Sequence, residues 1–194
     1  GVFDDCNALN SLNFEGSIKD WCENEYIEKM TAIYENGYSY ELTIGGSKLP
    51  SKLKLPSGTT KISSCAFVGR SEITEVTIPS SVTSVGYGAF AYCTNLKNVV
   101  IENGVSTLYD RAFAGCSVLE SLSIGQDVTF GTDVFAECVN LKKLDYLGTA
   151  TSYSGCGYMK KLRNWNAPVE KVLNNGSEFE TAFIADDVTE IPDY

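Results

Sequence analysis

A repeat of 22 to 23 residues runs through the middle of the chain and restricts its possible folds more than any other feature. Four phenylalanines recur at intervals of 23, 23 and 22 residues, at Phe67, Phe90, Phe113 and Phe135. Pairs of apolar residues recur in the same frame, at Val76/Ile78, Val99/Ile101, Leu122/Ile124 and Leu144/Tyr146. One segment of this length cannot bury its apolar side chains by itself, whereas stacked segments share one continuous core. The period therefore predicts a solenoid of equivalent coils.

Each repeat contains one short alternating stretch that predicts a β-strand. In the stretch Val99, Val100, Ile101 we expect the first and third side chains to point inward and Val100 to point outward. Stacking of the coils would join these strands into a parallel sheet on one face. On the other face, the small residue before each phenylalanine and the polar residues after it favour a short turn, a single helical turn or a 3₁₀ segment.

The repeat frame predicts one solenoid, 1–194, with regular and irregular parts. In the insertion, Asn36-Gly37 lies between β-prone Ile33-Tyr34 and Tyr38 to Tyr40, which predicts a hairpin. Both ends of the chain fall inside a repeat, so we expect a segment of a longer array. The coil edges at Phe3 and Ile191 lack recognisable caps, which predicts end-to-end self-association or fraying. The parts are a partial repeat (2–14), the insertion with its hairpin (15–50), four regular coils (51–146), a short coil plus an irregular insertion (147–183) and a truncated repeat (184–194).

Most of the seven cysteines follow the repeat. Five occupy one repeat position, which predicts a ladder of buried free thiols: Cys6, Cys93, Cys116, Cys138 and Cys156. Neighbouring members would lie close enough for a disulfide, but their parallel Cα–Cβ bonds disfavour the required torsion. Cys22 and Cys65 lie outside the ladder, and we expect them to be the more accessible pair. No Cys-x-x-Cys motif for zinc binding or redox work is present.

Composition excludes several classes of function. The chain has no histidine, which removes the commonest general base and metal ligand. With 15 basic and 25 acidic residues, its formal net charge of −10 disfavours nucleic acid as a partner. No apolar run is long enough to span a membrane. Adjacent acidic residues such as Asp4-Asp5 are expected to be solvated and not to form a catalytic pair. Together with the absence of histidine, this leads us to expect no catalytic residue, no cofactor and no bound metal.

The motif Leu-x-x-Leu-x-Leu marks three of the repeats, at Leu96/Val99/Ile101, Leu119/Leu122/Ile124 and Leu9/Leu12/Phe14. Asn or Cys is common three residues after the last position of this motif, but three residues after Ile78, Ile101 and Ile124 the chain has Ser81, Gly104 and Asp127. The sequence IPSSVTSVGYGAFAYCTNLKNVVI, from Ile78 to Ile101, resembles the BspA-like class of bacterial surface leucine-rich repeats. The expected fold class is then an α/β, β-rich solenoid wound as a right-handed superhelix. The resemblance implies a non-catalytic, adhesive protein that is secreted or displayed on the bacterial cell surface.

The outward strand positions form the candidate binding face, because the sheet of a solenoid presents an extended surface to a partner. We expect an extracellular protein or glycan to bind there; a solvated face with no ligand is equally compatible with the pattern. The face residues are Glu75, Thr77, Asn98, Val100, Ser121, Ser123, Lys143 and Asp145, with Lys52 and Lys54 beside them.

Tyrosines form a second candidate surface, because exposed tyrosine provides contact area at little entropic cost. Tyr34, Tyr38 and Tyr40 cluster around the predicted hairpin, where they could bind a partner or pack the insertion onto the solenoid. Tyr87 and Tyr109 also occupy positions that do not face inward, as does Tyr92. Two other functions remain open, a passive structural spacer and an accessory module of a larger secreted hydrolase.

Overall fold

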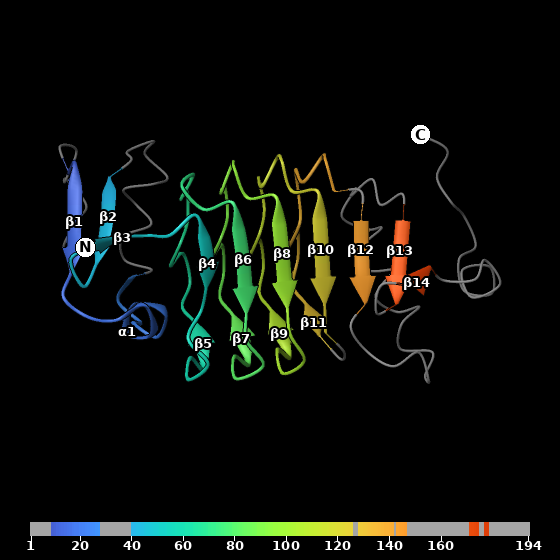
Figure 1. The fold of residues 1–194 in the computed structure, drawn as a ribbon, viewed down its shortest axis with the longest axis horizontal. Coiled ribbons are helices and arrows are strands. Elements are labelled where there is room, and N and C mark those ends of the chain that lie inside the picture. Colours follow the sequence, from blue (N-terminus) through green and yellow to red (C-terminus); the bar gives the residue numbers. More distant parts are fainter. Residues whose placement is uncertain are drawn as a thin grey trace.

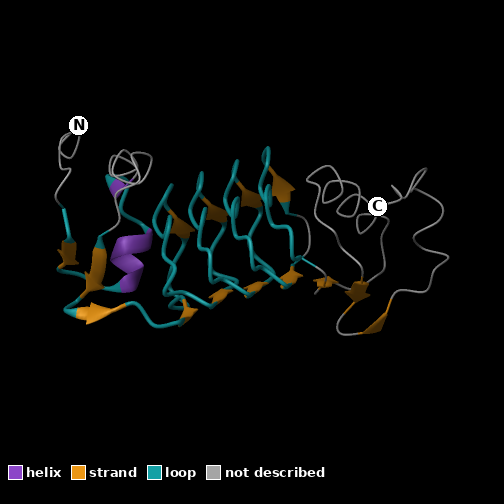
Figure 2. Ribbon diagram, turned by 90° about the horizontal axis from the view of Figure 1, so that it is seen from above, coloured by secondary structure: helices purple, strands orange, loops and turns teal. Residues whose placement is uncertain are grey.

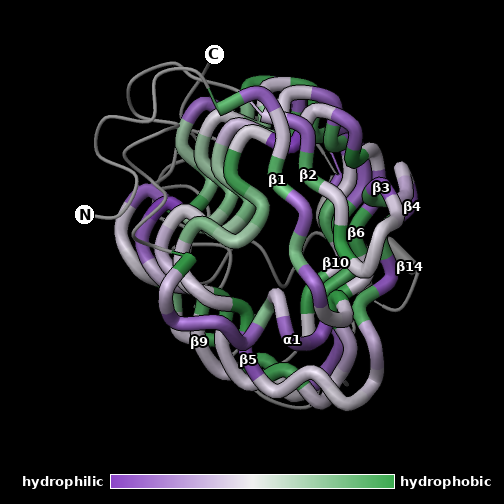
Figure 3. The backbone as a smooth tube through the Cα atoms, turned by 90° about the vertical axis from the view of Figure 1, so that its left-hand side faces the viewer, coloured by the Kyte–Doolittle hydropathy of each residue, from purple (hydrophilic) through white to green (hydrophobic). Residues whose placement is uncertain are grey.

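The computed structural model describes residues 9–27, 40–125, 128–141, 143–146, 171–174 and 177–178. Within these residues the chain forms a solenoid of stacked coils, with successive coils lying side by side along one axis (Figure 1). Figure 3 looks along this axis and shows the backbones of neighbouring coils nearly superposed. The predicted solenoid is thereby confirmed.

The main sheet has seven strands in the order β14-β13-β12-β10-β8-β6-β4. Neighbours from β4 to β13 pair in parallel, and β13 pairs antiparallel with β14. The strands from β4 to β12 take the predicted places in their repeats, because the inward apolar residues can be buried only in that register. Strands β13 and β14 lie within 147–183, for which a short coil and an irregular insertion are predicted. The strands are β4 (Lys52–Lys54), β6 (Glu75–Ile78), β8 (Asn98–Ile101), β10 (Ser121–Ile124), β12 (Lys143–Tyr146), β13 (Lys171–Asn174) and β14 (Ser177–Glu178).

A second, smaller parallel sheet occupies another side of the coils, in the order β11-β9-β7-β5. The coils then return to the main sheet through turns that carry the phenylalanines, so the helical or 3₁₀ segments expected there are not confirmed (Figure 2). The fold is a solenoid of parallel strands, and the α/β class is not confirmed either, because the described part of the chain has one short helix, α1. The strands of the second sheet are β5 (Lys61–Ile62), β7 (Ser84–Val85), β9 (Thr107–Leu108) and β11 (Thr129–Phe130).

A three-stranded sheet precedes the regular coils, with β1 (Ser11–Phe14) parallel to β2 (Glu41–Ile44) and β2 antiparallel to β3 (Ser47–Lys48). The hairpin between β2 and β3 turns at Gly45 and Gly46, whose φ angles are 57° and 74°. The hairpin predicted at Asn36-Gly37 lies outside the described residues.

Helix α1 (Ile18–Cys22) lies between β1 and β2 in the sequence. Its start is fixed by a capping box, in which the Ser17 hydroxyl accepts from the amide of Asp20 at 3.1 Å and the Asp20 carboxylate accepts from the amide of Ser17 at 2.9 Å.

The phenylalanines form a column through the core, as the period predicts. The ring centroids of successive residues from Phe67 to Phe135 are 5.1, 5.2 and 5.4 Å apart, and each pair is stacked. All four side chains are fully buried. The column is part of one apolar core that runs from Trp21 beside β1 and β2 to Leu141 in the fourth regular coil.

Two positions in every regular coil take a positive φ, one on each side of the phenylalanine. The first has φ between 55° and 59° and the second between 58° and 71°. Such values bend the chain sharply and favour glycine, yet five of the eight residues are not glycine. The bends keep the phenylalanine pointing into the core. The two sets are Cys65, Gly88, Arg111 and Asp133, and Gly69, Tyr92, Gly115 and Glu137.

Candidate macromolecule-binding face

Strand register gathers the outward side chains of the main sheet into two straight columns. Glu75 lies beside Asn98, and Thr77 lies beside Val100, in the same frame that aligns every neighbouring strand. All eight residues predicted for the face therefore lie together on it, about 4.8 Å apart from one coil to the next. The first column is Lys52, Glu75, Asn98, Ser121 and Lys143, and the second is Lys54, Thr77, Val100, Ser123 and Asp145.

Burial separates the two sides of the sheet clearly. The inward residues Val76, Val99 and Leu122 are at most 1% exposed, which confirms the predicted alternation. On the outward side Asn98 is exposed and Val100 half-buried, and the other predicted residues of the face fall in the same two classes. The face is consequently shallow and accessible along the described coils.

Charge on this face is concentrated toward its ends, while its centre is neutral. Lys52 and Glu75 form an ion pair of 2.8 Å, with side chains 73% and 39% exposed. An ion pair this exposed contributes little to stability. Between this pair and Lys143 lie only short or neutral side chains, such as Val100 and Ser121. A surface of this kind can make many hydrogen bonds and van der Waals contacts with a flat partner.

Carboxylates with lowered pKa values lie in and just after α1. A hydrogen bond from the Lys19 ammonium and a second from the Thr60 amide lower the pKa of Glu23. The Lys61 ammonium lowers the pKa of Glu25 in the same way. Within the part of the chain that is described, no group of three or more histidine, cysteine or acidic side chains could hold a metal ion.

The tyrosines of the second candidate surface play different roles. Tyr34 and Tyr38 lie outside the described residues. Tyr40 packs against buried Arg70, whose guanidinium carbon is 4.3 Å from the tyrosine ring centroid. The Arg70 Nη1 also donates to the Tyr40 carbonyl at 2.7 Å, and burial raises the pKa of the Tyr40 hydroxyl. Tyr40 thus joins the segment before β2 to the first regular coil.

The remaining exposed tyrosines lie away from the main sheet. Tyr87 and Tyr109 come directly after or shortly after strands of the second sheet, and they are 44% and 52% exposed. Tyr92, which is 39% exposed, occupies one of the positive-φ positions. All three point outward as predicted, but on the turns of the coils and not on the face built by β4 to β12.

The cysteine ladder is confirmed for its three described members. The thiols of Cys93, Cys116 and Cys138 are buried and donate to the carbonyls of Phe67, Phe90 and Phe113, at 3.1, 3.2 and 3.3 Å. These carbonyls belong to the preceding coil, so the thiols link one coil to the next. Cys6 and Cys156 lie outside the described residues.

The expectation that Cys22 and Cys65 are accessible is wrong. Cys22 is fully buried on the inner side of α1, and Cys65 is 5% exposed in the bend before Phe67. Burial raises the pKa of both Cys22 and Cys93 to about 12. A thiol with such a pKa is protonated at neutral pH and is a poor nucleophile.

Sequence reasoning also missed the contacts of α1 with the first regular coil. Trp21 and Cys22 are buried, and the Trp21 indole Nε1 donates to the Ala66 carbonyl at 2.7 Å. The capping-box pattern from Ser17 to Asp20 is a sequence signal for the start of this helix. No comparable local signal indicates that the helix packs against residues more than 40 positions later.

The comparison with protein-family models agrees with this architecture. Six copies of a family model described as "BspA type Leucine rich repeat region" match residues 46–161. No curated protein sequence matches the chain. The described residues contain no helix with the length and hydrophobicity needed to cross a membrane.

Two solved structures of bacterial leucine-rich repeat proteins are similar to the chain. One, from T. pallidum, has 24% sequence identity and a TM-score of 0.47, and the match covers 66% of this chain and 55% of that one. The other, from Bacteroides ovatus, has 22% identity and a TM-score of 0.30, over 58% of this chain and 39% of that one. The matched region thus spans about half the length of the T. pallidum protein.

Proposed function

We propose that this chain, which belongs to the BspA-type leucine-rich repeat family, is a non-catalytic interaction module that binds an extracellular protein or glycan through the outward face of its main sheet. Members of this family are built from stacked repeats, and such a fold provides an extended surface in place of a deep pocket. Secretion or display on a bacterial cell surface, and a role in adhesion, are parts of the same proposal.

The observation that carries the proposal is the alignment of outward side chains across the coils. Hydroxyl, amide and charged groups repeat at the spacing of the strands, and the backbone of the sheet holds each of them in place. Binding to a rigid surface loses little conformational entropy in the protein, so many individually weak contacts add up. The neutral centre around Val100 and Ser121 also avoids burying an unpaired charge under a partner.

A passive spacer is the second candidate, and one observation favours it. Lys52 and Glu75 already pair with each other, and the small side chains at the centre of the face expose little apolar area. A surface of this composition is also what a solenoid needs in order to stay solvated without a ligand.

Direct binding measurements test the proposal. The purified chain would be passed over immobilised extracellular-matrix proteins and over an array of glycans. We expect dissociation constants in the micromolar range for at least one of them, because contacts of this kind without buried aromatic anchors are typical of moderate affinity. Absence of binding to either class would favour the spacer.

Substitutions then locate the site. The triple variant Thr77→Arg, Val100→Arg and Ser123→Arg should weaken binding at least tenfold, since it fills the second column with long charged side chains. The matched control places arginine at outward positions of the second sheet, at Ser84, Thr107 and Thr129. Full binding by the face variant together with loss in the control would move the site to the second sheet and refute the proposed face.

A further inference from the structure

The first regular coil has no regular coil before it to bond to its backbone groups. In each later coil, backbone groups on the second sheet and on the phenylalanine turn bond to the coil before. The amides of Thr83 and Gly86 donate to the carbonyls of Thr60 and Ile62, both at 2.8 Å. On the turn, the carbonyls of Ala89 and Ala91 accept from the amides of the preceding coil, at 2.7 and 2.8 Å. The equivalent groups of the first coil are the amides of Thr60 and Ser63 and the carbonyls of Ala66 and Val68.

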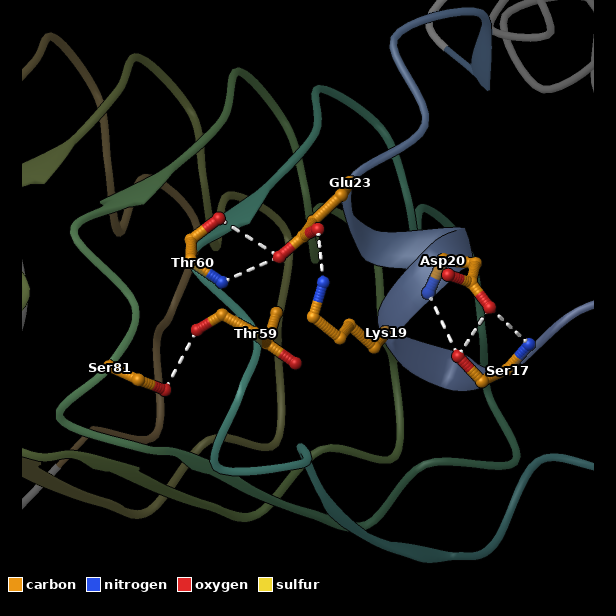
Figure 4. A network of polar contacts seen from close by, with 7 residues as sticks. All are labelled: Ser17, Lys19, Asp20, Glu23, Thr59, Thr60 and Ser81. Atoms are coloured by element: carbon orange, nitrogen blue, oxygen red, sulfur yellow. Dashed lines mark hydrogen bonds and ion pairs between the residues drawn. The ribbon is translucent and has the colours of Figure 1, made fainter.

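Residues around α1 supply both of the missing acceptors on the second sheet. The Glu23 carboxylate accepts from the Thr60 amide at 2.7 Å and from its hydroxyl at 2.9 Å (Figure 4). The carbonyl of Cys22, at the end of α1, accepts from the Ser63 amide at 2.7 Å. A side-chain oxygen and a helix-terminal carbonyl thus stand where the two carbonyls of a preceding coil would be.

Two side-chain donors complete the same edge on the turn. The Trp21 indole Nε1 donates to the Ala66 carbonyl at 2.7 Å, in the place of a backbone amide of a preceding coil. The Nε of Arg70 donates to the Val68 carbonyl at 3.3 Å. Arg70 occupies the cysteine position of the repeat, so the departure from the ladder at this coil coincides with its edge.

Packing and ion pairs anchor the segment in this position. Trp21 is 2% exposed and packs edge-to-face on Phe14, with ring centroids 5.2 Å apart. Lys19 pairs with Glu23 at 2.6 Å, which fixes the carboxylate that faces Thr60 (Figure 4). Lys61, in the edge strand itself, pairs with Glu25 at 2.8 Å.

We propose that residues 17–25 are a built-in cap that occupies the stacking site of a preceding coil and so prevents a coil of a second copy of this chain from adding to the first regular coil. Unpaired strand edges are templates for pairing with another chain. The coils of this chain are nearly identical in backbone. If the edge of the first regular coil were uncovered, a coil of a second copy would therefore fit it better than an unrelated strand would. The cap bonds to the Thr60 and Ser63 amides and to the Ala66 carbonyl, and it has no repeat of its own to extend.

The test uses the full chain and the double variant Trp21→Phe and Glu23→Met, which keeps the bulk of both side chains and removes one donor and one acceptor. The control variant Glu120→Met removes a carboxylate at an exposed position of a regular coil, away from residues 17–25. Amide hydrogen exchange and sedimentation velocity would be measured over a hundredfold range of protein concentration.

We expect the Thr60 and Ser63 amides of the double variant to exchange at least tenfold faster than in the control at low concentration. At high concentration their protection should return while the sedimenting mass rises. An unchanged mass, or a rise in mass without renewed protection at Thr60 and Ser63, would overturn the proposal. Protection of the Val99 and Leu122 amides from exchange reports that the coils remain folded. If the double variant loses this protection, the single variant Glu23→Met is tested in its place, by exchange at Thr60 and Ser63 and by the sedimenting mass.

Discussion

The rings of Phe90 and Phe113 lie almost parallel, with centroids 5.2 Å apart and an interplanar angle of 4°. Each ring is fully buried and stands one coil from the next. The distance between them is close to the spacing of the strands, because the same backbone ladder sets both. The phenylalanine column and the two sheets are therefore one packing arrangement, and a change in the column affects every coil it touches.

Truncation in the middle of this column should destabilise the whole array. Phe113→Ala removes a ring that stacks on both Phe90 and Phe135, and we expect a loss of about 3 to 5 kcal/mol in the free energy of unfolding. Urea denaturation followed by circular dichroism measures it. A loss below about 1 kcal/mol would contradict the stacked core. As a control, Val139→Ala changes an apolar side chain that is 63% exposed and should have little effect.

Close packing of the corners predicts a different outcome for two glycines with positive φ. At Gly104, whose φ is 137°, a Cβ atom would overlap the Ser80 carbonyl of the preceding coil. At Gly46, whose φ is 74°, a Cβ atom would meet nothing within 4 Å. Both alanine variants strain the backbone, by about 1 to 3 kcal/mol, but only Gly104→Ala also forces two coils apart. We expect Gly104→Ala to lower the thermal midpoint clearly more than Gly46→Ala, and equal shifts would argue against this close approach.

Thiol chemistry provides a third prediction. Cys22, Cys65, Cys93, Cys116 and Cys138 are all buried, so a thiol reagent should modify them only when the chain opens. We expect peptide mapping after brief labelling of native protein to find these five unmodified, and labelling in denaturant to find them fully modified. Rapid native labelling of Cys93 or Cys116 would contradict the buried ladder.

The carboxylate of Glu23 predicts a dependence of stability on pH. Its pKa in the folded chain is below the ordinary value of 4.5, first because of Lys19 and then because of Thr60. The ionised form therefore stabilises the fold above about pH 4.5, and this contribution is lost as the pH falls through the lower, folded value. Glu23→Gln should reduce stability at neutral pH by about 1 kcal/mol and make the decline between about pH 5 and pH 3 shallower.

Chemical denaturation at a series of pH values measures this effect. Glu120→Gln, at an exposed position of a regular coil, is the matched control and should leave the pH profile unchanged. A pH profile for Glu23→Gln that runs parallel to that of the wild type would show that the contacts of Glu23 with Lys19 and Thr60 do not stabilise the fold.

The candidate face was predictable because it depends only on the repeat. Once Val99 and Ile101 are known to be inward, Asn98 and Val100 must point outward, and equal repeat lengths place them beside Glu75 and Thr77. The phenylalanine column and the cysteine ladder follow from the same argument. Each of these features joins residues that hold the same place in neighbouring coils.

The sequence by itself determined the coils, their register and their core, because a period of apolar side chains has one arrangement that buries all of them. Only the tertiary structure revealed the second parallel sheet and the burial of Cys22, and only there did α1 prove to cover the edge of the first coil. The contact from Trp21 to Ala66 joins residues 45 positions apart that share no repeat position. Such a contact depends on how a segment without periodicity folds back over the array, and local sequence patterns do not encode that path.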